Sequence, residues 1–213
     1  MKQHPFWGSL SPLGGLTGAA ILIMASARLA WSITITGALI WVYGLSAFVF
    51  TLILNLVPKE KFHAGGLSLI FTCLASFFGS LYLLFIWFLS PFAAFEVFLV
   101  LLLVPLFCAS SGVFQRIVSV PENTQIDILE HVSDAVSQAA ALAGLLIAFS
   151  IIREPLSYCS LSLPGTFQGM ITIVYFRAGS FFPIGIFSAS AGALLLLGYF
   201  ICLYQYGKGF FHE

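Results

Sequence analysis

Four ionisable side chains fall on one face of a segment that is otherwise rich in small and apolar residues. Asp127, Glu130, His131 and Asp134 are spaced i, i+3, i+4 and i+7, which places them on one side of an α-helix. Carboxylates inside a membrane mark cation or proton pathways by default. Counting about 20 residues back from Arg153 puts the edge of the hydrocarbon near Asp134. The first three residues are therefore expected at the interface. Asp134 lies deeper and is the candidate for an ion pathway, the alternative being a hydrated first turn.

The composition of the chain explains why so few polar residues stand out. Of its 213 residues, 60% are hydrophobic and 8% are charged, and 23 are phenylalanine. An average soluble domain has about 25% charged residues. These values exclude a soluble enzyme, a disordered chain and a nucleic-acid-binding protein, and the formal net charge of zero leaves no basic surface for phosphates. The sequence therefore predicts a polytopic membrane protein.

Apolar runs long enough to cross a bilayer recur to the C-terminus. A spanning helix needs about 20 apolar residues, and such runs are too long for barrel strands. The sequence predicts an all-α membrane protein with a single membrane domain, 1–213, and six spans at about 6–27, 30–57, 66–89, 92–118, 125–153 and 181–206. The stretch 170–176 is apolar but short, which suits an interfacial or re-entrant segment. Six spans put both termini on one side, and the Lys and Arg residues there favour cytoplasmic termini.

Two of the six spans are interrupted at corresponding places. The first contains the segment 10–15 (Leu-Ser-Pro-Leu-Gly-Gly), and the fourth contains Pro105 followed by 109–112 (Ala-Ser-Ser-Gly). Each begins a three-helix half, 1–90 or 91–213, and a repeat of three helices would be inverted in the membrane. Paired interruptions in inverted halves indicate a site near the middle of the bilayer. The alternative is that Gly, Ser and Pro only allow close helix packing.

The remaining charged residues of the spans are expected at their ends. Glu96 and Arg116 lie near the start and end of the fourth span, where long side chains reach the headgroups. Arg153 and Glu154 are expected to cap the fifth span, because a cation near a helix C-terminus suits the helix dipole.

The cysteines form no CxxC pair and fit neither a disulfide framework nor a zinc site. We expect them to act as small hydrophobic residues, three of them in or near apolar helices. They are Cys73, Cys108, Cys159 and Cys202.

Several short segments, in this order and spacing, resemble one family. The segment 10–13 with Thr17 looks like its Leu-Cys-Pro-Leu segment and following Thr, and 105–116 looks like its Pro-Leu-x-x-x-Asn-Cys stretch ending in Arg. Residues 134–137 are similar to the family's Asp-Gly-Phe-Ser segment, and Arg153–Glu154 occupies the position of its Arg-Glu pair. Residues 183–187 are similar to its Pro-Pro-Gly-Ala-Phe segment. On these residues the chain resembles the six-helix membrane subunits of the Rnf and Nqr ion-translocating electron-transport complexes, most closely the E subunit of Rnf (the D subunit of Nqr).

The resemblance implies two inverted three-helix repeats with broken first helices, in the inner (cytoplasmic) membrane, paired with an inverted sister subunit. It also implies an iron–sulfur cluster near the midplane, held by one Cys from each broken helix and shared with the sister. This sequence has Ser11 and Ser111 at those two positions. A serine hydroxyl does not ionise near neutral pH and binds iron poorly beside a thiolate. Cys108, about one turn before Ser111, would substitute only if the broken helix changes register.

The sequence thus predicts a divergent subunit of an Rnf/Nqr-like complex that couples electron transfer to sodium or proton transport. The chain is at most one subunit of such an oxidoreductase. Ser11, Ser111 and Cys108 mark the altered cluster site, and Asp134 marks the ion pathway. The alternatives are a non-redox transporter subunit or a structural membrane subunit that kept the inverted-repeat fold. No nucleic acid is expected as a partner.

Overall fold

The computed structural model describes residues 27–57, 64–110, 117–118, 127–165, 170–175 and 185–210. Long helices make up most of this part of the chain: α2 (Leu29–Leu56), α3 (Ala64–Leu89), α4 (Pro91–Ser110), α6 (Ile128–Tyr158) and α7 (Ser190–Phe210). Two strands, β1 (Ser160–Pro164) and β2 (Met170–Tyr175), and a 3-10 turn, η2 (Gly185–Phe187), connect α6 to α7.

Four helices in the described ranges are long and apolar enough to cross a membrane, namely α2, α3, α4 and α6. The bounds of α2 and α3 lie within two residues of the second and third predicted spans, and α4 and α6 overlap the fourth and fifth, which supports a multi-spanning helical membrane protein. In α7 the apolar stretch is shorter, at Ala191–Phe200. The first predicted span, 6–27, lies almost wholly outside the described residues. The six-helix inverted repeat therefore stays a prediction.

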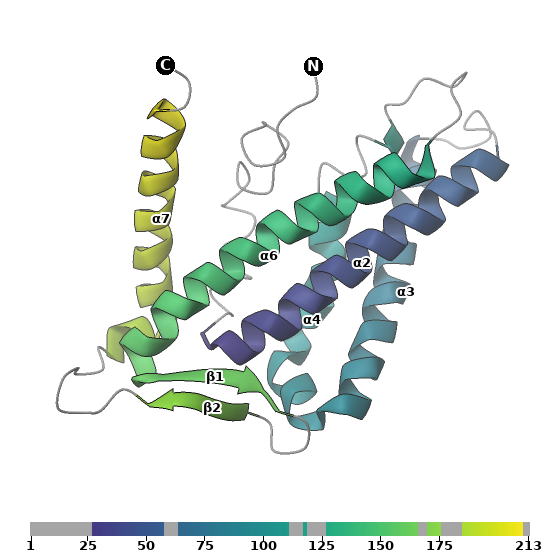
Figure 1. Ribbon diagram of the computed structural model, residues 1–213. Helices are drawn as coiled ribbons and strands as arrows, with labels where there is room; N and C mark the ends of the chain where they lie inside the picture. Colours follow the sequence, from purple (N-terminus) through teal and green to yellow (C-terminus); the bar gives the residue numbers. More distant parts are fainter. Residues whose placement is uncertain are drawn as a thin grey trace.

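Helix α2 is the centre of the bundle, because it contacts α3, α4 and α6. Its contact with α6 is the most extensive, and the two helices run antiparallel side by side (Figure 1). Helices α3 and α4 form a second antiparallel pair. The hairpin of β1 and β2 lies at the end of the bundle where α2 begins and α6 ends, which we call the hairpin end (Figure 1). The opposite end, where α6 begins, is the far end.

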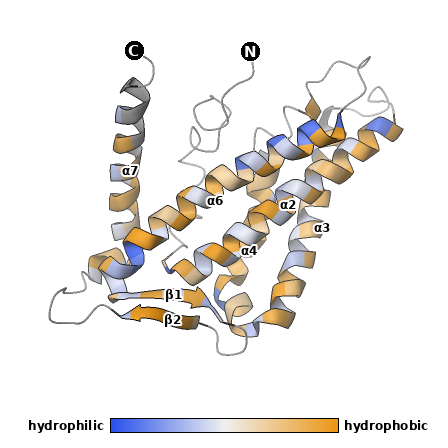
Figure 2. Cartoon of the chain, viewed as in Figure 1, coloured by the Kyte–Doolittle hydropathy of each residue, from blue (hydrophilic) through white to orange (hydrophobic). Residues whose placement is uncertain are grey.

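Most residues of α3 and α4 are apolar (Figure 2), and many of their large side chains are exposed, as a lipid environment requires. Phe88, Phe95 and Leu99 are each about three-quarters exposed, and many other large apolar side chains on these helices are also uncovered. A soluble monomer rarely exposes a contiguous apolar surface of this extent. The exposed faces therefore agree with the membrane class that the composition predicts.

Two expected helix ends differ from the structure, both at prolines. Pro105 does not interrupt α4, which continues to Ser110, and the second predicted break, 109–112, extends beyond the described residues. Pro155 does not end α6 either, because that helix continues to Tyr158. Proline removes one backbone donor but has a helical φ, so a helix can pass through it where packing holds the next turn. The αL residue Cys159, with φ 50°, then closes α6.

The connection after α6 departs from the all-α prediction, although most of the described residues are helical. Residues 170–175 form β2, paired antiparallel with β1, with an irregularity in register between Leu161 and Ser162. The run Ile-Thr-Ile-Val is β-branched throughout, and such side chains favour a strand. Length and hydropathy alone could not separate this strand from a short interfacial helix.

Candidate functional site

Polar side chains of the interior gather in two groups along the seam between α2 and α6. The first, at the hairpin end, comprises Arg28, Ser150, Arg153, Glu154 and Ser162, and we call it the hairpin-end cluster. The second, towards the far end, comprises Tyr43, Ser46, Cys108 and Gln138, and we call it the inner cluster. Apart from the half-buried Arg28, each residue of the hairpin-end cluster is almost fully buried.

Glu154 joins three elements of the hairpin-end cluster. Its side chain is 1% exposed, and its carboxylate accepts hydrogen bonds from the Leu29 backbone N–H at 2.8 Å and the Ser162 hydroxyl at 2.6 Å. The first N–H groups of a helix have no partner within it, and a negative charge there is favourable. The carboxylate of α6 therefore caps the start of α2 and also fixes β1.

Arg153 holds the connection between η2 and α7. Its guanidinium donates to the carbonyl oxygens of Phe187 at 2.8 Å, Ser188 at 3.2 Å and Ala189 at 3.4 Å. The side chain is 1% exposed, so these carbonyls compensate the loss of water around the charge. The prediction that Arg153 and Glu154 cap their own helix is wrong, since both side chains bind other elements.

Arg28 lies among aromatic side chains at the rim of this cluster. Its guanidinium carbon lies 4.8 Å from the ring centre of Tyr158 and 5.6 Å from that of Trp31, and Nη1 lies 3.2 Å from Sδ of Met170. Cation–π contacts of this kind are favourable where water is scarce. The Trp31 ring N–H donates to the exposed Glu96 carboxylate at 2.6 Å, so Glu96 lies at the surface, as expected.

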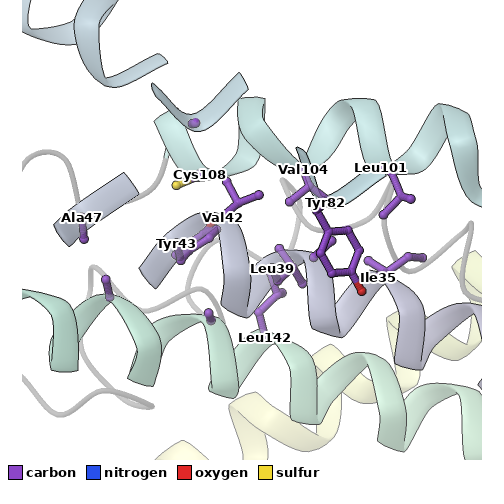
Figure 3. Close-up of a cluster of buried hydrophobic side chains, with 14 of the residues drawn as sticks. Ile35, Leu39, Val42, Tyr43, Ala47, Tyr82, Leu101, Val104, Cys108 and Leu142 are labelled. Atoms are coloured by element: carbon purple, nitrogen blue, oxygen red, sulfur yellow. The ribbon is translucent and has the colours of Figure 1, made fainter. Parts of the chain in front are cut away.

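The inner cluster contains a buried amide and a buried thiol. Gln138 is 1% exposed, and its amide nitrogen has no hydrogen-bond acceptor within the described ranges. The Tyr43 hydroxyl donates to the Phe107 carbonyl at 3.2 Å, and the Cys108 thiol lies beside the Ser46 hydroxyl. Figure 3 shows Cys108 of α4 close to Tyr43 of α2. Three helices thus contribute to this cluster.

An apolar layer separates the two clusters. It consists of Ile35 and Leu39 from α2 and Leu142 and Leu146 from α6, all at most 3% exposed. Residues 139–149 of α6 carry no polar side chain, which is about 18 Å of helix between Gln138 and Ser150. Dry apolar constrictions oppose the passage of ions. At this level α2 also carries the Thr36 hydroxyl, buried without a hydrogen-bond partner in the described ranges, and the Tyr82 hydroxyl donates to the Thr34 carbonyl at 2.9 Å, so the layer is mostly apolar rather than free of polar groups.

Asp134 stands where the polar strip of α6 enters the bundle. Asp127 and Glu130 are exposed, His131 and Asp134 are half-buried, and Gln138 is buried. The Asp127 carboxylate caps α6 by accepting from the Leu129 N–H at 3.0 Å. Exposure thus decreases from the first turn of α6 towards Gln138, and Asp134 lies one turn from Gln138. Its role in an ion pathway stays a prediction.

The residues that the structure describes do not fit an iron–sulfur cluster. Ser11 and Ser111 lie outside the described ranges, as does Arg116. Cys108 is fully buried inside the bundle, whereas a cluster shared with a second subunit needs ligands at the surface between them. Among the described residues no group of three or more His, Cys, Asp or Glu side chains is arranged to hold a metal ion. Cys73, Cys108 and Cys202 lie in helices, as expected.

The sequence did not predict that the side chains of the hairpin-end cluster connect α2, α6, β1 and the turn before α7. The signal was an Arg-Glu pair beside a proline at the end of a span, eight residues before Ser162. Such a pair is equally compatible with a helix end in the lipid headgroups, and only the tertiary structure reveals which groups it binds.

The chain was compared with protein-family models, with curated proteins and with solved structures, and none of them matches it. The described residues themselves show a mostly helical protein with four helices long and apolar enough to span a membrane.

Proposed function

We propose that the protein is a membrane-embedded subunit of an Rnf/Nqr-like complex that couples electron transfer to sodium or proton transport. The sequence segments described above support the family. The structural observation that carries the proposal is the apolar layer between the inner cluster and the hairpin-end cluster. A chain that works alone as a channel needs a continuous polar path, and residues 139–149 of α6 contribute no polar side chain to one.

In this proposal Asp134 receives the cation at the far end, and Gln138 provides polar atoms one turn further in. The apolar layer blocks the ion until partner subunits change the arrangement of the helices. In this proposal the redox groups are carried by those partner subunits. The proposed location is the inner membrane, with cytoplasmic termini and an inverted sister subunit as neighbour.

The proposal is tested by gentle purification of the tagged chain from its native membranes. Mass spectrometry would identify the associated subunits, and iron, sulfide and flavin would be assayed in the same particle. We expect flavin-bearing membrane subunits to co-purify in fixed ratio. A particle without redox partners would contradict the proposal.

Liposomes that contain only this chain separate the two alternatives. Transport of sodium or protons without an electron donor would identify a non-redox transporter. A chain that neither transports alone nor accompanies redox subunits, but is required for assembly of another complex, would be a structural subunit.

A further inference from the structure

The β-hairpin exposes an apolar strand outside the helix bundle. On β2, Ile171, Ile173 and Tyr175 are 55%, 56% and 78% exposed. No Asp, Glu, Lys, Arg or His occurs between Glu154 and Arg177. A long connection in water normally carries charged residues, because it has little surface to bury. Both the composition and the exposure of this segment therefore indicate a non-aqueous environment.

The hairpin is fixed at the level where the spanning helices end. Strand β1 contacts α2 and α6, and the Ser162–Glu154 hydrogen bond ties it to the last turns of α6. At the same end of the bundle α3 and α4 expose Trp87, Phe88 and Phe92. Aromatic side chains gather where a membrane meets water. Strand β2 thus extends the exposed apolar surface of α3 and α4, and its pairing with β1 fixes its position.

The backbone of β2 determines how deep the hairpin can lie. The described part of the sheet has two strands, so the outer edge of β2 is not paired within it. Unpaired N–H and C=O groups are too costly in the hydrocarbon core, where nothing can bond to them. Water and lipid headgroups at the interface supply partners for this edge while the side chains reach the acyl chains.

We propose that the β1–β2 hairpin is a membrane-interface element whose β2 side chains contact lipid. The occupant of the exposed surface is the headgroup–acyl boundary of the bilayer on the hairpin side. The inference rests on the fold and the exposed side chains, and it does not depend on the electron-transport proposal.

Photo-crosslinking in native membranes tests this placement with the full chain. A benzophenone amino acid would replace Ile173 or Tyr175, and mass spectrometry would separate phospholipid adducts from protein adducts. Leu99, 74% exposed in the middle of α4, is the lipid reference, and Leu129, 78% exposed beside Asp127, is the reference for the hydrated end.

We expect phospholipid adducts at Ile173 and Tyr175 at a yield within about twofold of that at Leu99. A dominant protein adduct would overturn the proposal and show that another subunit covers β2. A yield as low as that at Leu129 would also overturn it and place the hairpin in water. The Tyr175 substitution retains an aromatic ring, so it provides a result even where the Ile173 variant fails to fold.

Discussion

At the scale of single residues, Glu154 is the side chain whose loss the structure penalises most clearly. In Glu154→Ala the Leu29 N–H and the Ser162 hydroxyl both lose their acceptor in a buried place. An unsatisfied buried group costs about 1–3 kcal/mol, so we expect a marked fall in the thermal unfolding midpoint in detergent. Glu130→Gln, at an exposed carboxylate of the same helix, is the matched control. Equal midpoints for the two variants would show that Glu154 does not hold these elements together.

Asp134 gives a functional test at the same scale. Asp134→Asn keeps the shape of the side chain and removes its charge, so the complex should assemble while sodium- or proton-coupled activity falls at least tenfold. The electron-transfer rate measured alongside separates lost coupling from lost assembly. Glu130→Gln, one turn earlier and exposed, should leave the coupling intact. Unchanged coupling in Asp134→Asn would remove this carboxylate from the pathway.

At the scale of elements, glycines decide how closely the helices approach. A Cβ at Gly79 of α3 would lie 2.6 Å from Cγ of Pro105 in α4, and a proline ring cannot turn away. Overpacking of this kind costs about 1–3 kcal/mol, so Gly79→Ala should lower the unfolding midpoint. A Cβ at Gly144 of α6 would meet nothing within 4 Å, and Gly144→Ala should be neutral or slightly stabilising. If both variants melt alike, the close contact of α3 and α4 is wrong.

The elements also show what could be predicted from the sequence. The ends of α2 and α3 follow from the length of their apolar runs, because a helix in lipid must satisfy its own backbone. Strand β2 could not be predicted with the same assurance, since a short apolar run fits a strand or an interfacial helix. The partners of Arg153 could not be predicted at all, because they lie in a different part of the chain. Helical spacing alone places Asp134 one turn from Gln138, but its depth in the membrane and its role stay predictions.

At the scale of the whole molecule, the apolar layer predicts that the protein does not let protons leak across the bilayer. Liposomes that contain the full chain should hold a proton gradient as well as protein-free liposomes, as followed with a trapped pH-sensitive dye. Leu39→Ser with Leu142→Ser places hydroxyls between the two polar clusters and should increase proton leakage severalfold. Leu102→Ser, on the exposed face of α4, is the control for altered packing alone. Leakage through the wild-type chain would show that the layer is not a barrier.

The adjacency of Arg153 and Glu154 has a mechanical consequence for the bundle. Consecutive residues of a helix point about 100° apart, so the two side chains hold α6 in two different directions around its axis. One is bonded to the turn before α7, and the other to the start of α2 and to β1. Rotation or sliding of α6 alone would break both sets of bonds. Movement of α6 must therefore carry the start of α2, the hairpin and the turn before α7 with it.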